Sequence, residues 1–73
     1  MIKEIVSEKE IGLEIAKIMN EKGISQRKLA ELSGVSENTI FNLLKGSYHH
    51  KLDTYIRLCN ALDTTIYCVI FGK

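Results

Sequence analysis

Apolar residues recur at helical spacing through most of the chain, and short polar segments with serine or glycine interrupt them. Ser7 and Glu10 stand three residues apart in the order of a capping box, so a first helix is predicted to begin at Ser7. Gly23 is placed to end it. The inward face of this helix is predicted from four apolar residues at helical spacing, which are Ile11, Ile15, Ile18 and Met19.

The next segment predicts two short helices, about 26–32 and 37–45, joined by a three-residue turn. A serine opens each helix as N-cap, and a glycine ends each one where the backbone takes a positive φ. These capping and terminating residues alternate along the segment: Ser25, Gly34, Ser36 and Gly46. Two helices joined in this way are the layout of a helix-turn-helix, whose second helix can enter the DNA major groove.

A loop over residues 47–51 leads to a fourth predicted helix, about 52–62. Residues 7–62 therefore predict a helical bundle within one domain that covers residues 1–73. Each helix is expected to have an apolar inward face. These faces are Leu29 and Leu32 on the second helix, Ile40, Leu43 and Leu44 on the third, and Leu52, Ile56, Cys59 and Leu62 on the fourth.

Residues 64–71 are almost entirely β-branched or aromatic, which favours a β-strand over the alternative, a short fifth helix. A strand needs a partner for its backbone groups, and the expected partner is its own copy across a two-fold axis. Residues 2–6 are the competing partner within the chain. The predicted dimerisation residues are Ile66, Tyr67, Cys68, Val69, Ile70 and Phe71.

The net charge of +1 is small, but it is unevenly distributed. Residues 22–51 hold five basic and two acidic side chains, a net of +3 on the helix-turn-helix. This excess favours contact with phosphates, and an ordinary solvated surface is the alternative. No apolar run is long enough to span a membrane and no signal-peptide pattern is present, so a cytoplasmic protein is expected.

Enzyme and cofactor chemistry is not predicted. The sequence offers no set of nucleophile, base and orienting residue, and a chain of 73 residues has little room for a closed active site. Four side chains could in principle bind zinc, namely His49, His50, Cys59 and Cys68, but their spacing matches no compact zinc site. No cofactor or metal is therefore expected.

The second helix of the motif supplies the candidate base-contacting residues. Asn38 and Asn42 lie one turn apart, and each can offer a donor and an acceptor to an adenine edge. Glu37 can accept a hydrogen bond from a cytosine N4 amino group. Phe41 is expected either to cover a thymine methyl group or to complete the core against the fourth helix. The candidate phosphate contacts are Gln26, Arg27, Lys28, Ser36 and Lys45.

Residues 11–62 resemble the Cro and phage-repressor class of helix-turn-helix regulators, the XRE family of prokaryotes and phages. The matching residues are Ser25-Gln26, Leu29-Ala30, Gly34-Val35-Ser36, Thr39-Ile40, Leu43, Lys45-Gly46, Leu52-Asp53-Thr54 and Ala61-Leu62. The resemblance implies a mainly α fold of four or five helices that binds operator DNA as a dimer. It also implies that the helix after Ser36 is the recognition helix and that Gln26 contacts a phosphate.

The leading hypothesis is a homodimeric regulator, expected to act as a repressor, that binds a near-palindromic duplex DNA operator. The predicted C-terminal strand looks like the small-antitoxin branch of the family. That likeness keeps open a second hypothesis, an antitoxin that represses its own operon and binds a cognate toxin. A third hypothesis is a protein-interaction module that has lost DNA binding. The small net charge and Glu37 favour this third hypothesis, whereas Asn38, Asn42 and the basic residues of the motif disfavour it.

Overall fold

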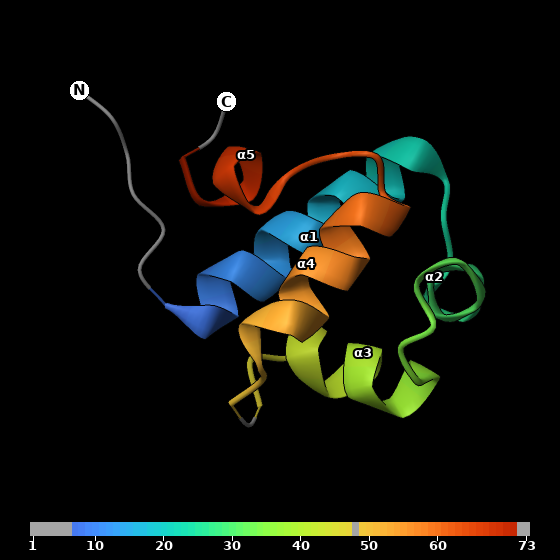
Figure 1. Cartoon of the computed structure of the whole chain (residues 1–73), viewed down its shortest axis with the longest axis horizontal. Helices are drawn as coiled ribbons and strands as arrows, with labels where there is room; N and C mark the ends of the chain where they lie inside the picture. The colour runs from blue at the N-terminus through green and yellow to red at the C-terminus, as the bar shows by residue number, and fades with distance from the viewer. Residues whose placement is uncertain (1–6, 48, 72–73) are drawn as a thin grey trace.

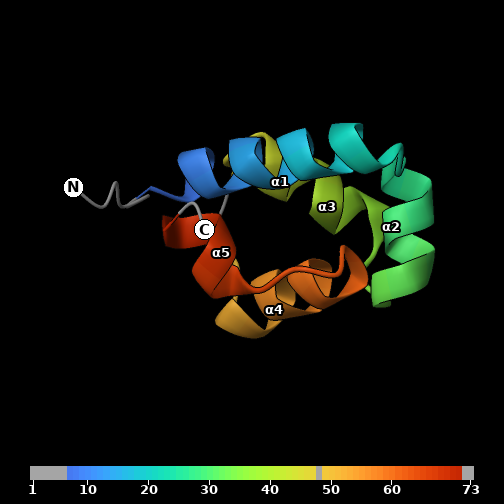
Figure 2. The same ribbon diagram turned by 90° about the horizontal axis from the view of Figure 1, so that it is seen from above.

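The computed structural model describes residues 7–47 and 49–71, and all the secondary structure in these ranges is helical. α1 and α4 lie on opposite sides of the molecule, with α2 at one end and α5 at the other (Figure 2), and α3 runs along the lower edge in Figure 1. The five helices are α1 (Glu8–Lys22), α2 (Gln26–Ser33), α3 (Glu37–Leu44), α4 (Leu52–Ala61) and α5 (Ile66–Phe71).

Serine side chains begin the first three helices, as the sequence predicts. Ser7, Ser25 and Ser36 have extended backbones, and each hydroxyl accepts a hydrogen bond of 3.1 Å from the backbone N–H three residues later. The Ser7 hydroxyl also donates to Oε1 of Glu10 at 3.0 Å, which ties the two residues of the predicted capping box together. These local bonds fix where the helices start before any tertiary packing is considered.

Three helices end in the same hydrogen-bonded motif. After α1 the N–H groups of Gly23 and Ile24 donate to the carbonyls of Asn20 and Met19, and Gly23 has a φ of +67°. The chain after α3 repeats the arrangement at Gly46, and the chain after α4 repeats it at Asp63. These bonds satisfy carbonyl groups that have no partner within a helix. The glycine stops predicted at residues 23, 34 and 46 are confirmed, since all three have positive φ.

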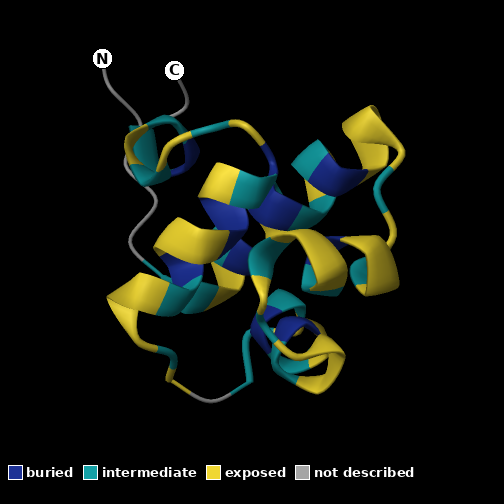
Figure 3. Cartoon of the chain, turned by 45° about the vertical axis from the view of Figure 1, so that its right-hand side comes forward, coloured by how far each residue is buried: buried dark blue, intermediate teal, exposed yellow. Residues whose placement is uncertain are grey.

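The core lies between the inward faces of the five helices (Figure 3). α1 packs against α3 and α5, α4 packs against α2 and α5, and α2 packs against α3. Many of the residues expected inside are there, and Ile11, Ile18 and Leu44 pack against the core while partly buried. The buried apolar residues are Ile15, Met19, Leu29, Ile40, Leu43, Tyr55, Leu58, Cys59, Leu62 and Val69.

The predicted apolar face of α4 is wrong in part. Leu52 and Ile56 are exposed, whereas Tyr55 and Leu58 occupy the inward face together with Cys59 and Leu62. Both sets have helical spacing, but the observed one buries the aromatic ring of Tyr55. Leu32 of α2, also expected inside, is 50% exposed. Packing against neighbouring helices, rather than periodicity alone, selects the face that turns inward.

The predicted C-terminal strand is also wrong, because residues 66–71 form α5. The Thr65 hydroxyl accepts a hydrogen bond of 3.1 Å from the N–H of Cys68, and the Thr65 carbonyl accepts one from Val69, so a helical turn begins here. Val69 is buried, and Tyr67 stacks on Phe71 one turn later. Burial against α1 and α4 outweighs the β propensity of the segment. The competing partner, residues 2–6, lies outside the described residues.

Candidate nucleic-acid interface

An open hollow lies where the N-terminal ends of α2 and α3 meet at the surface. It is lined by one residue of α2, Gln26, and by three of α3, Glu37, Asn38 and Phe41. Glu37, Asn38 and Phe41 are exposed, and Gln26 is half-buried. The turn through Gly34 brings the two helices to this arrangement, so four of the predicted contact residues are collected in one place. The hollow combines two amides, a carboxylate and an aromatic ring.

Phe41 does not complete the core. Its side chain is 47% exposed, while Ile40 and Leu43 on the same helix are buried. The Nζ atom of Lys45 lies 4.7 Å from the centre of the Phe41 ring, a cation–π contact between residues one helical turn apart. Of the two expectations for Phe41, the structure therefore excludes completion of the core.

The remaining predicted residues lie on α2 and α3 or at their ends and do not line the hollow. Asn42 is half-buried one turn beyond Asn38. Arg27 and Lys28 are exposed in the first turn of α2, and the Lys28 ammonium lies 3.8 Å from a carboxylate oxygen of Glu31. Ser36 is engaged as N-cap, and its hydroxyl also donates to the Thr39 hydroxyl at 2.8 Å. Basic and amide side chains are thus available beside the hollow.

Gly12 holds α3 against α1 and was not identified from the sequence. A Cβ atom at residue 12 would lie 2.5 Å from the carbonyl oxygen of Leu43 and 3.2 Å from the Cα of Leu44. The backbones of α1 and α3 therefore cross at a distance that only glycine permits. A glycine beside Ile11 on the inward side of a predicted helix was the available signal. This crossing fixes the orientation of α3 and hence of the hollow.

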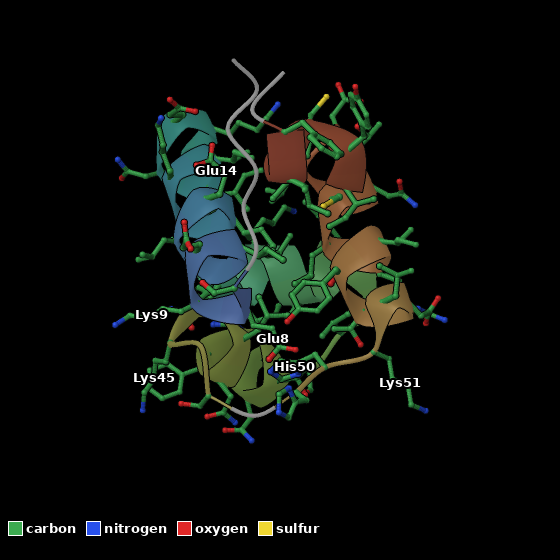
Figure 4. All side chains as sticks on the ribbon, turned by 90° about the vertical axis from the view of Figure 1, so that its left-hand side faces the viewer. Glu8, Lys9, Glu14, Lys45, His50 and Lys51 are labelled. Carbon is green, nitrogen blue, oxygen red and sulfur yellow. The ribbon has the colours of Figure 1, made fainter. Side chains whose placement is uncertain are left out.

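A second close approach joins α1 to the loop after α3. A Cβ atom at Gly46 would lie 2.9 Å from the Cα of Lys9, and Figure 4 shows Lys9 and Lys45 projecting outward on the same side of the molecule. In the same loop, Nδ1 of His49 lies 3.1 Å from a carboxylate oxygen of Glu8, an ion pair when the histidine is protonated. The start of α1 thus approaches the loop that follows α3 at Gly46 and at His49.

The residues considered for zinc have other surroundings. Nε2 of His50 lies 3.1 Å from the carbonyl oxygen of Ser47, and its ring meets Tyr55 edge-on. Cys59 is buried and Cys68 half-buried, both as free thiols. No group of three or more histidine, cysteine or acidic side chains that could hold a metal ion occurs within residues 7–47 and 49–71. Over the same ranges, no helix has the length and apolar character needed to cross a membrane.

The geometry defines a protein of the helix-turn-helix class, with α2 and α3 as the motif. The helix-turn-helix family model matches residues 15–67, and the chain belongs to this family, in its Cro and phage-repressor (XRE) type. The match spans α2, α3 and α4 completely. No curated protein sequence matches the chain.

Several solved structures have the same fold. The restriction-modification controller protein C.AhdI from Aeromonas hydrophila is 25% identical, with a TM-score of 0.82 over 86% of this chain and 96% of that one. The clp gene regulator ClgR from Corynebacterium glutamicum is 26% identical, with a TM-score of 0.82 over 90% of this chain and 85% of that one. The controller protein C.Esp1396I, as a tetramer with its natural 35 base-pair operator, is 21% identical, with a TM-score of 0.79 over 85% of this chain and 82% of that one. At this identity, the likeness shows the fold alone.

Proposed function

We propose that this protein is a transcriptional regulator that binds a specific duplex DNA sequence through α3. The observation that carries the proposal is the hollow of Gln26, Glu37, Asn38 and Phe41, which presents hydrogen-bonding groups on the outward side of the second helix of the motif. Family membership supports it, as do the regulatory roles named for C.AhdI and ClgR. We assign base contacts to Glu37, Asn38, Phe41 and Asn42, and phosphate contacts to Gln26, Arg27, Lys28, Ser36 and Lys45.

The two classes of contact predict different responses to substitution. Asn38→Ala should weaken binding to the preferred duplex by about 1–3 kcal/mol and leave binding to random duplex nearly unchanged, because a bidentate amide contact reads one base. Lys28→Ala should weaken both by the same factor, because phosphates carry no sequence information. Lys17→Ala, at an exposed lysine of α1 outside the motif, is the matched control.

The experiment begins with selection of duplexes from a random pool, followed by titration of the selected and random duplexes with each variant. A reporter driven from the selected sequence then gives the direction of regulation, with repression expected. Absence of any preferred duplex at low salt would refute the proposal. Equal losses by Asn38→Ala on selected and random DNA would refute the assignment of Asn38 to a base.

Self-association is proposed to use the outward face of α5. Tyr67 is 54% exposed and stacks on Phe71, with ring centres 4.7 Å apart, so two aromatic side chains lie together near the surface. Of the six predicted dimerisation residues, Val69 is buried in the core of its own chain and is removed from the proposed interface. A two-fold dimer would place two α3 helices on half-sites about 10–10.5 base pairs apart, or a multiple of that.

Sedimentation of Tyr67→Ser tests this interface. We expect the variant to be monomeric at concentrations where the parent is dimeric, with thermal stability changed little because the side chain is half exposed. Leu13→Ser, at an exposed leucine of α1, controls for loss of apolar surface. A Tyr67→Ser protein that remains dimeric would contradict the proposed interface. The antitoxin hypothesis is not retained, since the strand on which it depended is a helix.

A further inference from the structure

Phe41 is the exposed aromatic residue that lines the hollow between α2 and α3. The inward side of α3 is already filled by Ile40 and Leu43, which are 0% and 1% exposed, and Leu44 packs against the same core. The Phe41 ring points away from that core and forms one wall of the hollow. Because the ring is exposed at the hollow, it is available to contact a partner.

The surroundings of the ring specify what it could contact. The other lining residues, Gln26, Glu37 and Asn38, are all polar, so Phe41 is the one apolar wall of this hollow. In the DNA major groove the base edges present hydrogen-bond donors and acceptors, together with one apolar group, the C5-methyl of thymine. A methylated cytosine carries the same group at the same ring position. A hollow with three polar walls and one apolar wall is complementary to such a base edge.

Lys45 lies against the Phe41 ring, next to the place where a pyrimidine methyl group would contact it. Its ammonium lies 4.7 Å from the ring centre, and this cation–π contact favours the outward position of Phe41. A side chain that already favours its bound position loses less conformational entropy on binding. The contact also holds a positive charge beside the hollow, on the side where Figure 4 shows Lys45 projecting into solvent.

We propose that Phe41 is a specificity-determining residue that reads the C5-methyl group of a pyrimidine in the major groove. The proposal rests on the proposed DNA-binding function and goes beyond it by naming the chemical group recognised. Thymine and 5-methylcytosine are the two sources of that group. Deoxyuridine lacks only the methyl group of thymine, so replacing thymine by uracil isolates this contact without changing base pairing.

The test uses the full chain and its selected duplex, in which each thymine is replaced singly by uracil and each cytosine singly by 5-methylcytosine. If thymine is the source, a single replacement by uracil at one position of a half-site should weaken binding of the parent about fourfold, the effect expected for one buried methyl group. If 5-methylcytosine is the source, one methylation should tighten binding by a similar factor. In either case Phe41→Ala should abolish the difference and Phe41→Leu should retain part of it.

Leu13→Ala, which removes an exposed apolar side chain from α1, should respond to the methyl group as the parent does. Far-ultraviolet circular dichroism and thermal unfolding establish that each variant is folded. The inference is overturned if no methyl replacement changes affinity, or if Phe41→Ala responds to the methyl group as strongly as the parent. Failure to select any duplex would instead refute the proposed function, and this inference with it, so the two failures are distinguishable.

Discussion

Replacement of Gly12 by alanine should destabilise the protein, although alanine is the better helix former. In the interior of a helix, glycine to alanine stabilises by about 1 kcal/mol on propensity alone. The added Cβ, however, would lie 2.5 Å from the carbonyl oxygen of Leu43 and 3.2 Å from both Cα and O of Leu44. These are backbone atoms, so no rotamer change relieves the overlap, and α3 must move away from α1.

The expected magnitude follows from these two opposing effects. Overpacking of a core costs about 1–3 kcal/mol, and a clash with fixed backbone atoms belongs at the upper end of that range. Subtracting the gain in helix propensity leaves a net loss of about 1–2 kcal/mol. For a domain of this size, such a loss lowers the melting temperature by about 5–15 °C. Because α3 moves, DNA binding should weaken as well.

Thermal and urea unfolding followed by circular dichroism provide the measurement, with Gly23→Ala as the control. Gly23 has a φ of +67° and no atom within 4 Å of an added Cβ, so its substitution reports backbone strain without a clash. It should cost about 1 kcal/mol and leave DNA affinity unchanged, since the contact of α1 with α3 is preserved. If Gly12→Ala is more stable than the parent, the close crossing of α1 and α3 is refuted.

Two further predictions concern the end of α4. Asp63 is the one residue other than glycine with a positive φ among residues 7–47 and 49–71. Because glycine adopts this conformation at little cost, Asp63→Gly should raise the free energy of unfolding by up to about 1 kcal/mol. A loss of stability would contradict the helix-end geometry. Burial raises the pKa of the Cys59 thiol from 9.0 to about 11, with the nearby Cys68 thiol adding to the shift. The neutral thiol therefore favours the folded state below about pH 9, and this contribution should decrease as the pH rises to about 11. The free energy of unfolding of Cys59→Ala should therefore depend less on pH in this range than that of the parent. Identical slopes for the parent and the variant would contradict the raised pKa of Cys59.

The helix boundaries could be predicted because they depend on local chemistry. Ser7, Ser25 and Ser36 each satisfy a backbone N–H three residues later, and the glycines at the helix ends adopt the positive φ that other residues avoid. These requirements act within one turn, so the sequence displays them directly. The same reasoning could have located the start of α5, since Thr65 caps Cys68 in the same way.

The inward faces and the C-terminal segment depended on contacts between helices. Leu52 and Ile56 have helical spacing, yet the packing of α4 against α2 and α5 buries Tyr55 and Leu58 instead. Residues 66–71 have β-branched and aromatic composition, yet a helix places Val69 inside and brings Tyr67 against Phe71. A strand would put Tyr67, Val69 and Phe71 on the same face. Intrinsic preference was therefore reversed by burial.

The members of the candidate site were identifiable from the helix-turn-helix spacing, but their grouping was not. The sequence marks Gln26 and Glu37 separately, each at the start of a helix. Only the angle between α2 and α3 brings them to one hollow with Asn38 and Phe41. The sequence also left two expectations for Phe41, and its exposure excludes completion of the core. Spacing along a chain identifies the face of a helix, whereas the crossing of helices determines which faces meet.

The small net charge sets a quantitative limit on DNA binding. Residues 22–51 carry a net of +3, and three of their five basic side chains, Arg27, Lys28 and Lys45, are assigned to phosphates. A dimer would therefore bring about six positive charges to the phosphates, and each neutralised phosphate contributes about −0.9 to the slope of log affinity against log salt concentration.

We therefore expect a slope of about −5 for a dimer on its selected duplex, measured by fluorescence anisotropy over a range of salt concentrations. Lys28→Gln removes one contact per protomer and should make the slope shallower by about 2, whereas Lys17→Gln should leave it unchanged. A slope near zero with high affinity would show that phosphates are not the contacted groups. A steep slope that Lys28→Gln does not change would place the phosphate contacts elsewhere on the surface, because the charge that the substitution removes would then lie outside the interface.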